Sequence, residues 1–127
     1  MARLIGRIIV ALGGLLGAFL FAVTWGDPVQ LGPMLGVTAS RPLGLASIRA
    51  DLGAFFALWA AFALVAAWRA DRSLLIVPML LLALAIAGRV VTLFGGMTPD
   101  MIQPIVIEAV TLAAFALAWR LLGPVRR

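Results

Sequence analysis

The stretch LLIVPMLLLALAIAGRVVTLF, residues 74–94, decides the fold of this chain. It includes thirteen Leu, Ile, Val or Phe residues and one charged residue, Arg89. A helix of about 20 apolar residues crosses the hydrocarbon core of a bilayer. On the membrane-insertion scale, such apolar residues together favour insertion by roughly 4–8 kcal/mol, whereas a central arginine opposes it by roughly 2.5–3.5 kcal/mol. The segment therefore predicts a transmembrane helix that tolerates Arg89.

Three other apolar stretches have the same character, so the sequence predicts an all-α protein: an antiparallel bundle of four transmembrane helices in one domain, residues 1–127. The predicted spans cover residues 8–25, 49–68, 74–94 and 99–122. Hydrophobic residues make up 65% of the chain and charged residues 12%, which excludes an ordinary water-soluble domain. The longer link, residues 26–48, combines prolines and glycines with apolar residues, so we expect it to lie at the membrane surface or to re-enter the membrane.

The distribution of arginine predicts the orientation of the bundle. Alternating spans assign seven arginines to one side and Arg41 to the other. The seven are Arg3, Arg7, Arg69, Arg72, Arg120, Arg126 and Arg127. Because short arginine-rich segments stay in the cytoplasm, we expect both termini there, with the 26–48 link on the opposite side of a bacterial inner membrane. The net charge of +5 then reflects orientation, and no nucleic-acid partner is expected because the arginines form no basic face.

Four charged residues fall at the start of a span or inside one: Arg49, Asp51, Arg89 and Glu108. At about 1.5 Å per helical residue, Arg89 lies about 8 Å and Glu108 about 12 Å from the same, non-cytoplasmic, side. An arginine facing a carboxylate is far less costly in lipid than either group alone, so we predict an Arg89–Glu108 ion pair. We expect Arg49 to face the same pocket and Asp51 to bind first-turn amides or an arginine from the side.

Three classes of function remain open for this cluster. In the first, Arg49, Arg89, Glu108 and Asp51 form a ligand site, where arginine holds the anionic group of a membrane lipid or similar amphipathic molecule and apolar walls hold its tail. In the second, the ion pair only fixes helix register in an accessory subunit of a larger membrane complex. In the third, Glu108 serves a lipid isomerase or transferase, or a proton-coupled transporter. No other catalytic residue is predicted, and the absence of histidine and cysteine excludes the usual metal, haem and thiol chemistry, so no cofactor is expected.

Small residues in the first span predict close helix contacts. Gly13 and Gly17 form a G-x-x-x-G pattern, which packs either inside the monomer or against a second copy or another protein. Gly53 in the second span is expected to let another backbone approach. Of the four tryptophans, Trp59 lies in mid-span and is expected to pack in the core, while the other three lie at span ends as interface anchors.

The run Ile48-Arg49-Ala50-Asp51-Leu52-Gly53, followed by Gly88-Arg89 and by Glu108, resembles a bacterial family of small four-helix membrane proteins known only as a domain of unknown function. The resemblance covers roughly residues 47–122. In that family the pattern is Arg, any residue, an acid, an aromatic residue and two glycines, so Leu52 and Ala54 depart from it here. The resemblance implies the same architecture and the same polar residues, and it implies no activity.

Overall fold

The computed structural model describes residues 1–124, and every regular element in that range is helical. The long helices are α1 (Ala2–Gly26), α4 (Gly53–Arg69), α5 (Ile76–Leu93) and α6 (Ile102–Leu122). With their short extensions, four helices in the described range are long and apolar enough to cross a membrane: Ala2–Gly26, Pro42–Arg69, Arg72–Leu93 and Pro99–Leu122. The predicted antiparallel bundle of four transmembrane helices is thus confirmed, although the first span begins six residues earlier and the second seven residues earlier than expected.

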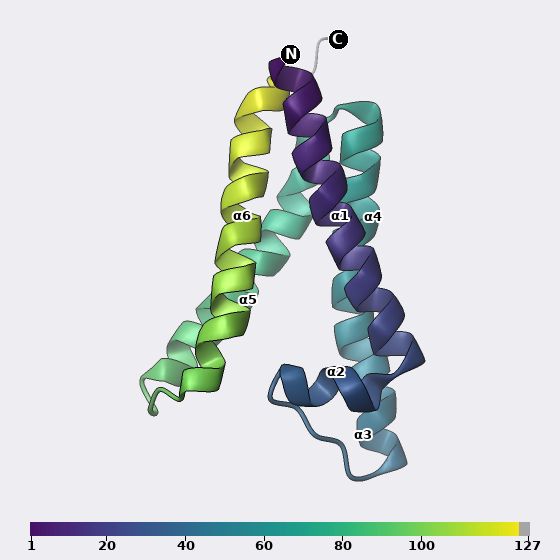
Figure 1. Ribbon diagram of the computed structural model, residues 1–127, viewed down its shortest axis with the longest axis vertical. Coiled ribbons are helices and arrows are strands. Elements are labelled where there is room, and N and C mark those ends of the chain that lie inside the picture. Colours follow the sequence, from purple (N-terminus) through teal and green to yellow (C-terminus); the bar gives the residue numbers. More distant parts are fainter. Residues whose placement is uncertain (125–127) are drawn as a thin grey trace.

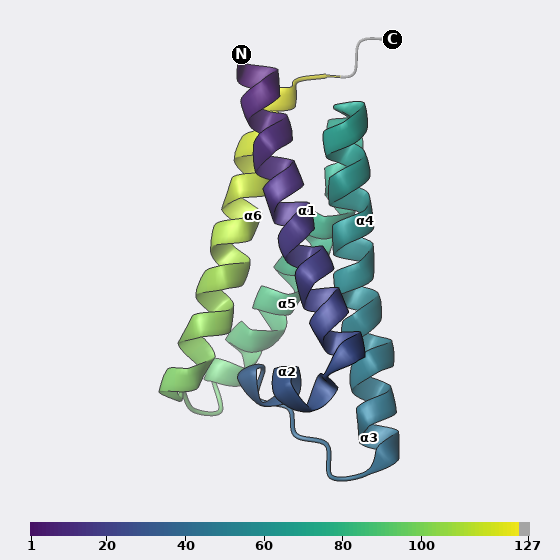
Figure 2. The ribbon, with the colours of Figure 1, turned by 45° about the vertical axis from the view of Figure 1, so that its right-hand side comes forward.

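The helices form two pairs that separate toward one end of the bundle. All four lie close together where α1 begins and α6 ends, and α5 with α6 then diverges from α1 with α4 (Figures 1 and 2). The short helix α2 (Pro28–Met34) lies across the open end, between the two pairs. This splayed end contains Arg89 and Glu108, so the architecture places the charged residues where the bundle is widest.

The 26–48 link is folded rather than irregular. Asp27 caps α2 by accepting a hydrogen bond from the Gln30 amide at 3.1 Å, and proline occupies the first helical position. After α2 the chain turns at Gly36, whose φ of +74° favours glycine. It then enters α3 (Pro42–Ser47), which continues through a π-helical turn, η1 (Ile48–Leu52), into α4. The second span therefore starts inside the segment that the sequence assigned to the link.

The 3-10 turns η2 (Arg72–Leu75) and η3 (Pro99–Met101) introduce α5 and α6. Asp71 caps η2 by accepting hydrogen bonds from the hydroxyl and amide of Ser73 at 2.7 and 2.9 Å, and these bonds lower the pKa of its carboxyl group. Thr98 occupies the N-cap position before Pro99, but its side chain makes no capping hydrogen bond.

The glycine face of α1 packs inside the monomer. A Cβ at Gly13 would meet the ring of Phe115 on α6, and one at Gly17 would lie 3.1 Å from the backbone nitrogen of Ala60 on α4. Between them, Gly14 faces Leu64 of α4. These contacts let α1 approach α4 and α6 closely, as small residues do in membrane helices. Of the two sequence-based alternatives for this face, packing inside the monomer is therefore the one that these contacts support.

Large apolar side chains on all four spans point outward, among them Leu12, Leu84, Val91 and Val110, each 63–69% exposed. In water such an apolar surface would promote aggregation, whereas in a bilayer it faces lipid tails. Trp59 is 1% exposed and packs with Phe56 and Phe115, which confirms its predicted core position.

Candidate functional site

Arg89 and Glu108 form the predicted ion pair. The guanidinium of Arg89 donates from Nε to Oε2 of Glu108 at 2.9 Å and from Nη2 to Oε1 at 3.0 Å. The pair joins α5 to α6 close to the ends at which those helices are linked, since Arg89 lies about one turn before the end of α5 and Glu108 less than two turns after the start of α6. This agrees with the depth expected from the sequence. The side chains are 28% and 12% exposed, so Arg89 remains partly accessible while Glu108 is largely covered.

The pair lies in the wall of an apolar cavity of about 530 Å³. Every long helix contributes to this cavity, and Leu35, which follows α2, also lines it. Toward the middle of the bundle its walls are aliphatic and aromatic: Leu16, Leu20, Phe55, Phe56, Trp59 and Leu81. The volume falls within the range of about 300–1,000 Å³ that is typical of small-molecule sites.

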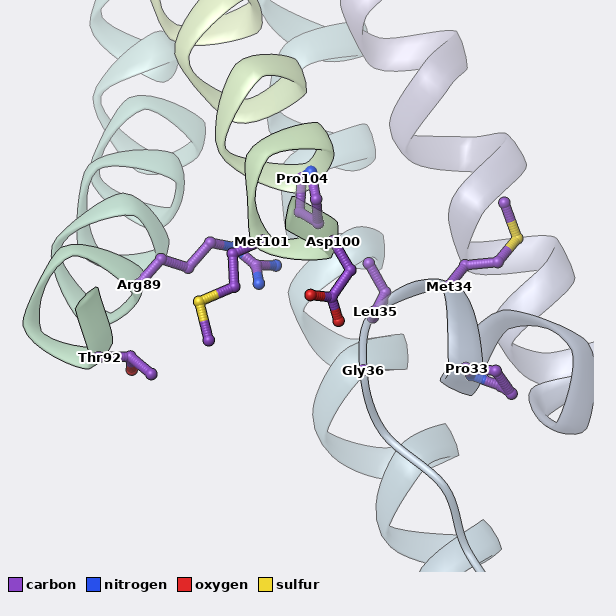
Figure 3. Close-up of a pocket in the computed structure, with 9 residues that line it drawn as sticks. All are labelled: Pro33, Met34, Leu35, Gly36, Arg89, Thr92, Asp100, Met101 and Pro104. Carbon is purple, nitrogen blue, oxygen red and sulfur yellow. The ribbon is translucent and has the colours of Figure 1, made fainter. Parts of the chain in front are cut away.

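A second, more polar pocket of about 250 Å³ lies toward the linked ends of α5 and α6. It shares Leu35, Arg89 and Pro104 with the apolar cavity, so the two are adjacent and meet at Arg89. Figure 3 shows Arg89 extending from α5 toward the start of α6, where Asp100 and Met101 lie, with Leu35 and Gly36 on the opposite wall. Along the bundle the site therefore changes from polar to apolar, with the arginine at the boundary.

Comparison with family models, curated proteins and solved structures finds no match. The resemblance to a four-helix bacterial family therefore stays a prediction.

Arg49 does not join Arg89 and Glu108, contrary to the sequence-based expectation. Its Nε donates to the backbone carbonyl of Trp25 at 3.0 Å, at the C-terminal end of α1, and Arg49 lines neither pocket. The expectation assumed α-helical geometry, whereas Arg49 and Asp51 lie in the π-helical turn η1, which changes the direction of both side chains. Asp51 is exposed and lines neither pocket, so it too is outside the site.

Gly53 also differs from its expected role. The group that approaches it is the indole of Trp25, not a backbone: a Cβ at Gly53 would meet Nε1 and Cδ1 of that ring. Together with the Arg49 hydrogen bond, this contact fastens the end of α1 to the beginning of α4. Arg49 and Gly53 therefore both help to hold α1 against α4 at the splayed end.

Arginine caps the α1–α4 pair at both ends. Arg7 of α1 donates to the carbonyls of Ala67 and Trp68 at 2.8 and 3.3 Å, near the C-terminus of α4, just as Arg49 caps α1. A cation at a helix C-terminus contributes about 0.3–1 kcal/mol, and up to about 2 kcal/mol when partly buried. These bonds satisfy carbonyl groups that the helices themselves leave free.

We expect Arg49→Met to lower the free energy of unfolding by about 1 kcal/mol, because the Trp25 carbonyl loses its donor. Thermal unfolding in detergent measures the effect. Arg41→Met is the matched control, since Arg41 is exposed at the start of α3 and makes no side-chain capping bond there. Equal stability of the two variants would contradict the capping role.

Sequence reasoning missed several residues that line the site, Asp100 and Leu35 among them. Asp100 lies in η3 and Leu35 in the 26–48 link, and neither is among the residues predicted for the site, yet both line the polar pocket. Nothing local marks them, because their place depends on α2 folding across the open end. The hydroxyl groups of Thr92 and Thr111 donate hydrogen bonds to the carbonyls of Gly88 and Ile107 in their own helices.

Proposed function

We propose that this chain is a multi-pass protein of the bacterial inner membrane, with both termini in the cytoplasm, that binds an amphipathic membrane lipid at Arg89. The anionic group of the lipid would bind the guanidinium, and an acyl chain would occupy the apolar cavity. One observation carries the proposal: a partly exposed arginine lies where a polar pocket meets an apolar cavity of about 530 Å³.

Arg89 retains donors for a ligand. A guanidinium has five N–H donors, and Glu108 accepts two of them, one from Nε and one from Nη2. The other three have no hydrogen-bond partner among residues 1–124. A phosphate or carboxylate could accept from them while Glu108 keeps the arginine in position, which is the planar, bidentate recognition for which arginine is suited.

The cavity also has lateral access for a lipid chain. Leu84 on α5 and Ile107 on α6 line it and are 69% and 42% exposed. In a bilayer these residues face lipid tails, so a chain can pass from the membrane into the cavity without crossing a polar barrier. Inside, the buried indole N–H of Trp59 has no partner among the described residues, and an ester oxygen that reached it would remove the cost of an unsatisfied donor.

The proposed orientation rests on the distribution of arginine. Arg3, Arg7, Arg69, Arg72 and Arg120 are close to the end of the bundle where α1 begins, and Asp71 is the acid among them. At the splayed end, Arg41 and Arg49 are offset by Asp27, Asp51 and Asp100. This asymmetry supports a cytoplasmic position for the arginine-rich end. Arg126 and Arg127, which add to the sequence-based count, lie outside the described residues.

The geometry gives less support to the other two classes of function. Both carboxylate oxygens of Glu108 accept from Arg89, so acid–base chemistry or proton transport would first have to break this pair. Attachment to a larger complex through Gly13 and Gly17 has less support, because α4 and α6 cover that face.

Native mass spectrometry of the protein released from its own membranes tests the proposal. Wild type is expected to carry one discrete lipid adduct, and Ala85→Phe is expected to lose it, because Ala85 lines the cavity one turn from Arg89 and the added ring would obstruct the space beside the guanidinium. The matched control is Ala87→Phe, two residues away on α5, at an exposed position that lines neither pocket. Absence of an adduct from wild type, or equal retention by both variants, would count against the proposal.

A further inference from the structure

We infer that the bound lipid is zwitterionic, with its phosphate at Arg89 and an ammonium group at Asp100, as in a phosphoethanolamine headgroup. The inference rests on the proposed function and names the chemistry of its ligand. Asp100 lines the same polar pocket as Arg89, and Figure 3 shows both side chains at that pocket. Arg89 and Asp100 nevertheless do not form an ion pair. Among residues 1–124, the salt bridge with a nitrogen–oxygen distance within 4.0 Å is the one between Arg89 and Glu108.

The charge of the site disfavours a purely anionic headgroup. Arg89 is already neutralised by Glu108, and Asp100 adds a further negative charge to the pocket. Among the described residues, no charged side chain other than Arg89, Glu108 and Asp100 lines the polar pocket or the apolar cavity. Arg49, the nearest candidate in the sequence analysis, instead donates to the Trp25 carbonyl. An anion alone would therefore meet two carboxylates and one arginine that is already paired. A headgroup that also carries an ammonium group gives each charge a partner.

The order of the two pockets matches the order of groups in a lipid. The pocket with Asp100 lies at the linked ends of α5 and α6, and the cavity extends from Arg89 toward the middle of the bundle. A lipid in that leaflet has its amine outermost, then its phosphate, and its acyl chains toward the bilayer centre. Asp100, Arg89 and the apolar cavity occur in the same sequence, so a lipid can bind without changing its orientation in the membrane.

The test compares headgroups. The full chain is placed in nanodiscs that contain equal amounts of phosphatidylethanolamine and phosphatidylglycerol, and native mass spectrometry measures which lipid it retains. We expect wild type to prefer phosphatidylethanolamine by about tenfold, the effect of one charge-assisted hydrogen bond. Asp100→Asn should abolish this preference. Asp51→Asn is the control, because Asp51 is an exposed aspartate at the same end of the bundle that lines neither pocket.

Each outcome has a separate meaning. A wild-type protein that retains phosphatidylglycerol equally or better, or an Asp100→Asn variant with unchanged preference, overturns the zwitterionic headgroup and leaves lipid binding intact. Failure of wild type to retain either lipid overturns both this inference and the proposed function. Loss of preference in Asp51→Asn as well would assign the effect to the surface charge of the splayed end rather than to the pocket, which also overturns the inference.

Discussion

Glu108→Ala is expected to lower the free energy of unfolding by about 3 kcal/mol. The substitution leaves the guanidinium of Arg89 without its carboxylate in the splayed half of a bundle embedded in lipid, and removing one partner of a buried pair typically costs about 3–5 kcal/mol. We place the effect at the lower end because 28% of the Arg89 side chain is exposed. Unfolding in detergent followed by tryptophan fluorescence measures the change.

The double variant Arg89→Leu/Glu108→Leu is the control, since replacing both partners by apolar residues is often neutral or stabilising. We expect it to unfold at least as late as wild type. A double variant as unstable as Glu108→Ala would show that the cost arises from helix packing and not from the unpaired charge. The folded double variant also separates function from structure: loss of the lipid adduct assigns the pair to the binding site, whereas retention makes the pair a structural link between α5 and α6.

Gly17→Ile is expected to destabilise the monomer by about 3 kcal/mol or more. A Cβ at this position would lie 3.1 Å from the backbone nitrogen of Ala60 and 3.2 Å from the indole of Trp59. Backbone cannot move aside as a flexible side chain can, so α1 must separate from α4 and lose contacts along its length. Thermal unfolding of the monomer in detergent measures the loss.

The matched control is Gly88→Ile in α5, where a Cβ would meet nothing within 4 Å and the substitution faces open space. It should change stability by less than about 1 kcal/mol. If Gly17→Ile left the monomer as stable as Gly88→Ile does and instead released a second protein, the packing of α1 described above would be wrong.

The sequence alone sufficed for the features that depend on local composition and on distance along a helix. Residues 74–94 were expected to form a membrane-spanning helix because a helix satisfies the backbone hydrogen bonds of so apolar a segment within the segment itself. The meeting of Arg89 with Glu108 followed from depth, since a short link between antiparallel helices places both residues at nearly the same level. Trp59 in mid-span was correctly assigned to the core for the same reason.

Tertiary structure alone decided which partner each polar or small residue meets. Arg49 lies at the right depth for the pocket, but a π-helical turn and the free carbonyl at the end of α1 direct it elsewhere. The sequence left two possible partners for Gly13 and Gly17, and only the packing of α1 between α4 and α6 chose between them. The cavity, and the presence of Asp100 and Leu35 beside it, depend on the divergence of two helix pairs and on α2 lying between them. The depth of a residue in the membrane is set by its distance along the chain from a helix end, which the sequence gives. The direction of its side chain and the identity of its neighbours depend on how whole helices rotate and tilt against one another, and no local sequence pattern encodes that.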